Sequence, residues 1–254
     1  MDLQKIKKMQ QAGKILGEVL EILVSRIKPG ITEIQIDQLA EKLIKERRGE
    51  SGFKKVPGYH HTICISCNDV VVHGIPTERV LKDGDVVGID CGVYLNGYHT
   101  DMAETVIVGK KQVNTPSSKF LEAGKNAMFE AIRQAKAGNR VGDISRAMQG
   151  VIEEGGYSVV RNLVGHGVGK NLHEEPEIPG YLAGKIKNTP LLKPGMTIAI
   201  EAIYNMGKKE VVYTEDDDWT IVTEDGSISG LFERTILITE KGPELLTYLK
   251  TDAL

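Results

Sequence analysis

The chain has 254 residues, of which 32 are basic and 35 acidic, giving a net charge of −3 at pH 7. A chain of this length buries a substantial core and forms one large domain or two small ones. The balanced charge argues against direct DNA binding or attachment to a membrane surface, although it leaves room for a local basic patch. The first residues lack the apolar core of a signal peptide, and no apolar stretch is long enough to span a bilayer.

The three cysteines are Cys64, Cys67 and Cys91. They are few and odd in number for a secreted disulfide scaffold, which favours a reducing compartment and a cytoplasmic protein. Cys64 and Cys67 have the spacing of a metal or redox pair, but no second cysteine pair completes a zinc site. We therefore expect structural thiols, or thiols that line a pocket.

The chain begins with two expected helices. The first helix ends at Pro29-Gly30, because proline cannot continue the hydrogen-bond ladder. Its apolar residues recur at helical spacing: Ile6, Met9, Ile15, Val19, Leu20, Leu23 and Ile27. Thr32 and Gln35 form a capping box at the start of the second helix. A further pair follows, with one helix over 117–135 and another that begins near Gly142. Strands are expected at 62–66, 86–93, 102–108, 197–204, 219–222 and 235–239.

A ten-residue pattern occurs twice. Residues 81–90 (LKDGDVVGID) and 192–201 (LKPGMTIAIE) each have a Lys-x-Gly turn, then an apolar run that ends on a carboxylate. The same offset of 111 relates Ala12-Gly13-Lys14 to Ala123-Gly124-Lys125. No Pro/Ser-rich linker separates the halves. We therefore expect one α+β domain over 1–254, built by duplication with repeats of about 12–110 and 123–239, and a site at the interface of two related halves.

Residues 90–101 predict a hairpin with Asn96-Gly97 as its turn, since this dipeptide is a strong hairpin signal. With these two residues as the loop, Asp101 lies opposite Gly92. Asp90 then becomes a diagonal neighbour of Asp101 on the same face of the hairpin. Two carboxylates this close repel each other, and one stays protonated unless a cation lies between them.

Five acid and imidazole side chains are candidate metal ligands: Asp90, Asp101, His166, Glu201 and Glu233. Asp90 and Glu201 end apolar runs, His166 lies in a glycine-flanked turn, and Glu233 precedes a β-branched run, whereas a solvated turn acid has no such context. Asp101 joins them as the hairpin neighbour of Asp90. The set is rich in oxygen, which suits Mn, Fe, Co or Zn better than a thiolate site would. Four carboxylates also carry more charge than one divalent ion balances, which favours a two-metal hydrolase.

At these residues the chain resembles the type I methionine aminopeptidases of the short bacterial kind, within the superfamily that has the pita-bread fold. The resemblance covers about 12–239 and rests on five segments: 64–76 (CISCNDVVVHGIP), 165–169 (GHGVG), 173–176 (HEEP), 219–223 (WTIVT) and 232–235 (FERT). It implies two pseudo-symmetric halves with a central antiparallel sheet covered by two helix pairs.

The resemblance implies roles for the five candidate ligands toward two divalent ions, which are Co, Mn, Fe or Zn. Asp90 would bind one ion, Asp101 and Glu233 would bridge both, and His166 and Glu201 would complete the other. Glu201 would also pass a proton from the attacking water to the leaving amine.

The resemblance also implies that His73 and His173 contact the substrate and take part in catalysis. His60, His61 and His99 are more simply structural. Tyr59, Cys64 and Trp219 fit the family's methionine pocket, and Phe53 and Leu172 are looser assignments. For Trp219, an ordinary core position is the alternative, but its place after the acidic run 215–218 favours the mouth of a hairpin.

Two positions depart from the family pattern, Ala202 where proline is common and Arg234 where histidine is common. We expect Arg234 to place a fixed positive charge beside the metal carboxylates and to alter metal affinity or the pH optimum.

The expected function is removal of the initiator methionine from nascent polypeptides, before a small second residue. The expected protein is a monomer with a possible transient ribosome contact. The alternatives are an Xaa-Pro aminopeptidase or prolidase, which usually carries an added N-terminal domain, and a non-catalytic relative that binds peptides or ribosomes.

Overall fold

The computed structural model describes residues 2–110 and 113–252. The first half of the chain contains α1 (Leu3–Arg26), α2 (Glu33–Glu46), β1 (Glu50–Ser51), the short 3-10 helix η1 (Phe53–Lys55), β2 (Ile63–Cys67), β3 (Val70–Val72), β4 (Val86–Leu95) and β5 (Tyr98–Ile107). The second half contains α3 (Pro116–Gln134), α4 (Val141–Glu154), β6 (Ser158–Val159), β7 (Val164–Gly167), β8 (Glu174–Pro179), the 3-10 helix η2 (Ile186–Asn188), β9 (Thr197–Asn205), β10 (Val211–Tyr213), β11 (Ile221–Thr223), β12 (Ser229–Thr239) and β13 (Gly242–Leu245). None of the helices among these residues is long and apolar enough to cross a membrane.

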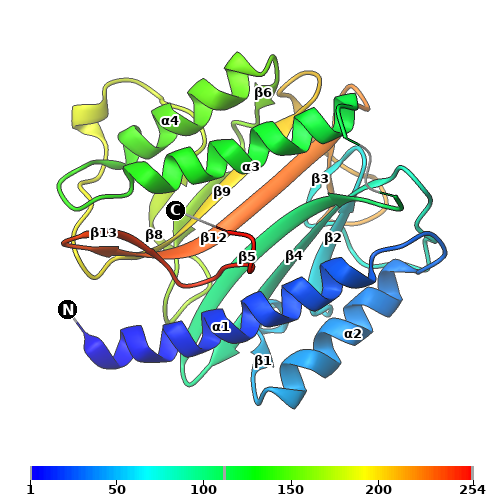
Figure 1. Cartoon of the computed structure of the whole chain (residues 1–254), viewed down its shortest axis with the longest axis horizontal. Coiled ribbons are helices and arrows are strands. Elements are labelled where there is room, and N and C mark those ends of the chain that lie inside the picture. The colour runs from blue at the N-terminus through cyan, green and yellow to red at the C-terminus, as the bar shows by residue number, and fades with distance from the viewer. Residues whose placement is uncertain (1, 111–112, 253–254) are drawn as a thin grey trace.

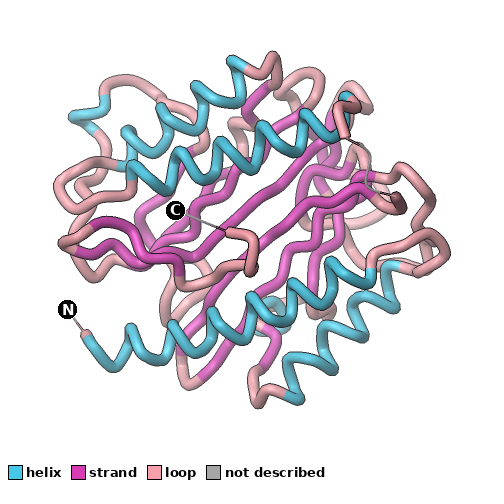
Figure 2. The backbone as a smooth tube through the Cα atoms, in the orientation of Figure 1, coloured by secondary structure: helices cyan, strands magenta, loops and turns pink. Residues whose placement is uncertain are grey.

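A ten-stranded antiparallel sheet forms the centre of the molecule (Figure 2). Its main path runs β1-β4-β5-β12-β9-β7-β8, with β2, β13 and β6 attached to β4, β12 and β9. Helices α1 and α2 pack on the β4–β5 half, and α3 and α4 pack on the β9–β12 half (Figure 1). A separate three-stranded sheet has the order β10-β11-β3. These layers confirm the expected pita-bread architecture.

The period-two alternation of the strands separates two faces of the sheet. In β4, Val87, Ile89 and Cys91 pack against the helices α1 and α2. In β9, Ile198 and Ile200 pack against α3 and α4 in the same way. Successive side chains of a strand point to opposite faces, so the acidic residues that come between or after these apolar ones lie on the face that the helices leave uncovered.

The two copies of the Lys-x-Gly pattern have the same local structure. Gly84 and Gly195 have φ values of +88° and +91°, a left-handed conformation that glycine adopts without strain. Gly84 N–H donates to Val108 O and Gly195 N–H to Ile238 O, so each turn is tied to the far end of β5 or β12. These matched bonds confirm two pseudo-symmetric halves, while the duplication and its boundaries stay predictions.

Two strands differ in extent from the expected ones. The strand expected over 219–222 begins only at Ile221, because the Asp217 carboxylate accepts hydrogen bonds from the N–H groups of Trp219 and Thr220 and holds a turn there. The strand expected over 235–239 is longer, since β12 begins at Ser229 and pairs with β9 along its length.

Gly124 allows α3 to lie directly on β9. A Cβ atom at this position would come within 2.2 Å of the Tyr204 ring, and Tyr204 is fully buried. We therefore expect Gly124→Ala to lower the free energy of unfolding by about 1–3 kcal/mol through overpacking, measured by urea denaturation.

Gly150 in α4 is the matched control, since a Cβ there meets nothing within 4 Å. Gly150→Ala should raise stability by up to about 1 kcal/mol through helix propensity. Equal effects of the two substitutions would contradict the close approach of α3 to Tyr204.

Candidate metal centre

Asp90 and Asp101 come from the hairpin formed by β4 and β5. Asn96 and Gly97 both have positive φ values, 52° and 91°, as a two-residue type I′ turn requires. Asp101 pairs with Gly92, and Asp90 pairs with Ala103. The predicted register is therefore confirmed, and the two aspartates are diagonal neighbours on the same face.

The second half contributes three further candidate ligands. Glu201 in β9 lies directly opposite Glu233 in β12. His166 in β7 pairs with Ala199, two residues before Glu201. The His166 Nδ1 atom lies 2.9 Å from the Gly167 carbonyl oxygen, which orients the ring, and its Nε2 atom lies 4.0 Å from Glu201 Oε1.

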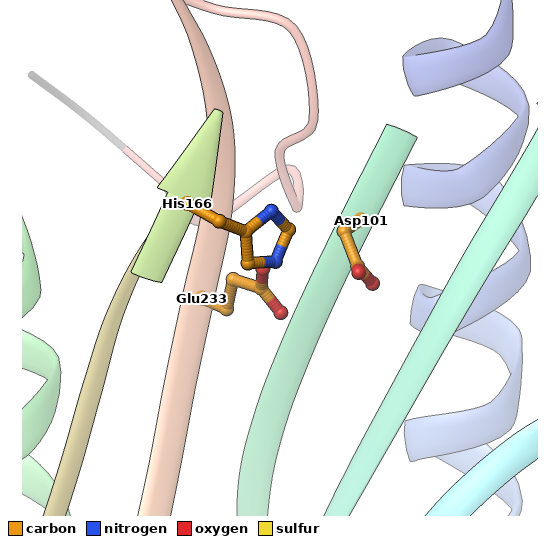
Figure 3. Close-up of side chains that lie close together, drawn as sticks. All are labelled: Asp101, His166 and Glu233. Atoms are coloured by element: carbon orange, nitrogen blue, oxygen red, sulfur yellow. The ribbon is translucent and has the colours of Figure 1, made fainter. Parts of the chain in front are cut away.

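All five candidate ligands line one cavity. One ligand atom each from Asp101, His166 and Glu233 lies within 4.8 Å of the other two. Figure 3 shows the three side chains converging from separate strands. Asp90 and Glu201 line the same cavity outside this tightest group. The structure thus gathers residues that lie up to 143 positions apart (Asp90 and Glu233).

The electrostatics of these carboxylates fit a bound cation. Burial raises the pKa of Asp101 to about 7 and that of Glu201 to about 8. Burial, together with the neighbouring carboxylates, raises the pKa values of Asp90 and Glu233 well above the ordinary range. Asp90 Oδ1 and Glu233 Oε1 are buried without any hydrogen-bond partner. Buried acceptors of this kind are costly unless a cation or donor satisfies them.

Two further histidines lie at the edge of the carboxylates. His73 and His173 both line the cavity, and the His173 ring stands edge-on to His166 with 4.4 Å between centroids. Burial lowers the pKa values of His73 and His173 and lowers that of His166 to about 4. All three rings are therefore neutral near pH 7, so each has one N–H donor and one ring nitrogen that accepts or binds a metal.

The other end of the cavity is apolar. Phe53, Tyr59, Cys64 and Leu172 are buried together, and Trp219 packs against them half-buried. The Tyr59 and Trp219 ring centroids lie 5.1 Å apart, and the Tyr59 hydroxyl donates to Ile63 O. Burial raises the pKa of the Cys64 thiol, which keeps the thiol neutral.

Val56 also lines this wall, and no sequence pattern indicates it. Val56 is a single valine in an irregular segment, so no periodicity singles it out. The acidic run before Trp219 is a mostly exposed turn, and Trp219 lies at the cavity wall rather than in the core.

A second cavity continues from the first. The two cavities share four residues, His73, His166, His173 and Glu201. From these the second cavity extends along β8 to the exposed side chains of Glu175 and Glu177. A carboxylate centre therefore lies between an apolar pocket and an open groove.

The expected position of Arg234 is wrong, while an effect on metal affinity or on the pH optimum stays a prediction. Its side chain points to the helix-covered face of the sheet and is fully buried. Its Nε atom lies 2.7 Å from Asp252 Oδ2, and its Nη2 atom lies 2.6 Å from Glu104 Oε2. Neighbouring residues of a strand face opposite sides, so Arg234 follows a candidate ligand without joining it. Its effect on the pKa of Glu233 is the smallest of the five causes.

A buried cluster of four carboxylates and an imidazole that opens to a cavity is the donor set of a metal-dependent hydrolase. The family model of metallopeptidase family M24 matches residues 7–240. The methionine aminopeptidase of Clostridium perfringens is 44% identical over 246 residues, which cover 97% of each chain. Methionine aminopeptidase 1 of Bacillus subtilis is 46% identical over 239 residues, which cover 94% of each chain.

The crystal structure of the methionine aminopeptidase from Thermotoga maritima has a TM-score of 0.92 at 40% identity, covering 97% of this chain and 98% of that one. The prolidase from Pyrococcus furiosus shares the fold with a TM-score of 0.75 at 24% identity, and the match covers 98% of this chain but 65% of the prolidase. The chain belongs to metallopeptidase family M24. The resemblance to methionine aminopeptidases and the expected enzyme class, a hydrolase, are confirmed.

The raised carboxyl pKa values predict how the metal-free protein responds to pH. A carboxyl group whose pKa is higher in the folded state than its usual value near 4 destabilises the fold progressively as pH rises from the usual value to the folded value, above which the effect levels off. For Asp101 and Glu201 the folded values are about 7 and about 8. The melting temperature in a chelator should therefore still fall as pH rises from about 7 to about 8, where most histidines are neutral in both states, and should fall less steeply above that range.

Added Mn²⁺ should reverse this fall, and Glu201→Gln should make it shallower. Both effects are measured by thermal unfolding followed by circular dichroism. A metal-free melting temperature that rises over this range would contradict the buried carboxyl pKa values.

Proposed function

We propose that this enzyme removes the N-terminal initiator methionine from nascent polypeptides, preferably before a small second residue. The observation that carries the proposal is the order of the features along the cavity. The apolar residues, among them Tyr59, Trp219 and Phe53, line only the first cavity, the carboxylates line that cavity as well, and the groove continues from the residues that both cavities share. An apolar pocket beside the carboxylates favours an exopeptidase that holds one terminal side chain and lets the rest of the chain leave.

The pocket supports methionine as that side chain. Its wall combines aromatic rings with the neutral Cys64 thiol, and a flexible thioether makes favourable contacts with such rings. Among the described residues, those that form the apolar part of the pocket carry no charged side chain, so a long apolar residue fits there better than a charged one.

Members of family M24 are metallopeptidases. We assign two divalent ions, Co, Mn, Fe or Zn, to the five candidate ligands. Asp90 would help to hold one ion and His166 and Glu201 the other, with Asp101 and Glu233 contributing ligand oxygens to the pair. When bound, such ions polarise the peptide carbonyl and lower the pKa of the attacking water. The orphaned oxygens of Asp90 and Glu233 support this assignment.

The remaining steps belong to side chains of the chain itself. Glu201, as a carboxylate beside the bound ions, accepts the proton of the attacking water and returns it to the leaving amine. His73 and His173 are neutral and line both cavities. The N–H group of each ring therefore donates a hydrogen bond to the substrate peptide where the pocket meets the groove.

The setting proposed for this activity is the cytoplasm, where nascent chains with initiator methionine occur, with a monomer as the working form. A transient ribosome contact follows from that substrate. The Xaa-Pro aminopeptidase alternative is weaker, because 46% identity to a methionine aminopeptidase compares with 24% to a prolidase that shares the fold. A non-catalytic binding role is weaker as well, because the cavity keeps four carboxylates and three histidines.

Glu201→Ala and Asp101→Asn should abolish metal-dependent release of methionine from a Met-Ala-Ser peptide. The first removes the proton carrier and a ligand oxygen, and the second removes a charge between the ions. Release is measured by chromatography of the free amino acid. Glu240→Ala, an exposed glutamate in the turn after β12, is the control and should retain full activity. Wild-type turnover in either site variant would refute the assignment.

Substrate choice separates this proposal from its closest enzymatic alternative. The wild-type enzyme should cleave Met-Ala-Ser and leave an Ala-Pro-Ser peptide intact under the same metal conditions. Trp219→Ala should raise KM for Met-Ala-Ser, since it opens the wall that holds the methionine side chain. Preferential cleavage of the Xaa-Pro peptide would favour the prolidase-like alternative.

A further inference from the structure

The two halves of the sheet meet at a short ladder. Strands β5 and β12 pair at only two positions, Ala103 with Glu233 and Met102 with Arg234. The neighbouring ladders are much longer, since β4 and β5 share ten pairs and β12 and β9 share nine. Asp101 and Glu233 stand on opposite sides of this seam, so its geometry sets the separation of two candidate ligands.

A threonine hydroxyl extends the ladder at each end. Thr235 Oγ1 accepts the N–H of Asp101 at 2.9 Å and donates to the carbonyl of the same residue at 2.8 Å. At the other end, Thr105 Oγ1 accepts the N–H of Leu231 at 3.0 Å and donates to its carbonyl at 2.6 Å. One hydroxyl has the donor and the acceptor lone pair that each arrangement needs.

These two threonines are equivalent under the pseudo-symmetry of the fold. Thr105 lies three residues before Val108 and Thr235 three before Ile238, the two carbonyls that accept from the matched turn glycines. The residues whose backbone groups they hydrogen-bond differ in chemistry. Thr105 holds Leu231, an apolar residue, whereas Thr235 holds Asp101, a candidate ligand. The threonine hydroxyl therefore bonds the backbone of a candidate metal ligand at one end of the seam only.

Asp101 depends on Thr235 for its backbone N–H. The residue is 4% exposed and Thr235 is fully buried, so no bulk water reaches these groups. The Thr247 hydroxyl accepts the N–H of Thr235 at 2.8 Å and fixes the backbone from which Thr235 reaches across the seam. Without the Thr235 hydroxyl, the buried N–H of Asp101 loses the acceptor that the structure gives it, and the strand must shift to find another.

We propose that Thr235 is a positioning residue that holds Asp101 across the seam at the distance from Glu233 and His166 at which the three side chains share a metal ion. The proposal rests on the metal centre of the proposed function. Thr235 touches neither substrate nor metal in this role. It acts through the backbone of Asp101, so its removal changes metal affinity before it changes any contact with the peptide.

Calorimetric titration of the metal-free proteins with Mn²⁺ tests the proposal. Thr235→Val keeps the shape of the side chain and removes the hydroxyl, and it should raise the Kd for Mn²⁺ about 10–100-fold, as loss of a group that orients a ligand does. Thr235→Ser restores the hydroxyl and should bind Mn²⁺ nearly as wild type does.

Thr105→Val is the matched control. It removes the equivalent pair of hydrogen bonds from the same seam, so thermal unfolding should show a similar loss of stability in the metal-free protein. Its Kd for Mn²⁺ should nevertheless equal that of wild type. Equal loss of Mn²⁺ affinity in both valine variants would overturn the proposal, since the seam would then act only through stability.

Thr235→Ala leaves room for a water molecule in place of the hydroxyl and serves if Thr235→Val does not fold. It should still bind Mn²⁺ more weakly than wild type, and wild-type affinity in any folded Thr235 variant without the hydroxyl overturns the proposal. Failure of the wild-type protein itself to bind Mn²⁺ would instead refute the metal centre. The two failures are therefore distinguishable.

Discussion

Four carboxyl groups lie together on one face of the sheet and line one cavity, with Asp101 and Glu233 buried and Asp90 and Glu201 partly buried. Two carboxylates at 4 Å repel with about 4 kcal/mol at the effective dielectric constant typical of proteins. The fold holds them there through strands whose other face is anchored by helices α1 to α4. The rest of the site depends on this enforced crowding, because it creates the demand for cations, and burial together with Asp101 raises the pKa of Glu201 in the metal-free protein.

On the opposite face of the same seam, carboxylates are paired with basic side chains of the protein. Arg234 pairs with Glu104 and Asp252, and Lys125 from α3 contacts both carboxylates. The Arg234 guanidinium also donates to the carbonyls of Ala103 and Glu233, one on each strand of the seam. A buried ion network satisfied in this way costs about 3–5 kcal/mol to break. Negative charge is thus compensated within the protein on the helix side and left for bound ions on the other.

The direction of the reaction also follows from the arrangement of the layers. The apolar wall is built from the first half of the chain and from Leu172 and Trp219, whereas the groove runs along β8 and carries exposed glutamates. His73 and His173 stand at the junction of the two cavities. Under the proposed function, the terminal side chain would occupy the apolar end and the departing chain would leave along the groove, as removal of a single N-terminal residue requires.

Local sequence determined the parts of this site that short-range physics controls. The Asn96-Gly97 turn sets the register that makes Asp90 and Asp101 neighbours, and the alternation of apolar and acidic residues tells which side chains share a face. Family-like segments also pointed to the five candidate ligands and the two histidines. None of these patterns predicts the distance between ligand side chains that lie on different strands. The grouping of Asp101, His166 and Glu233 arises only when both halves pack.

The same limit explains what the sequence misread or missed. Arg234 looked like a charge beside the metal carboxylates because adjacency in sequence says nothing of the Asp252 carboxylate that neutralises it from the C-terminal segment. Val56 joins the pocket from an irregular segment, and Thr235 reads as an ordinary β-branched strand residue. What each of these side chains does depends on a partner far along the chain, and tertiary packing alone decides which partner that is.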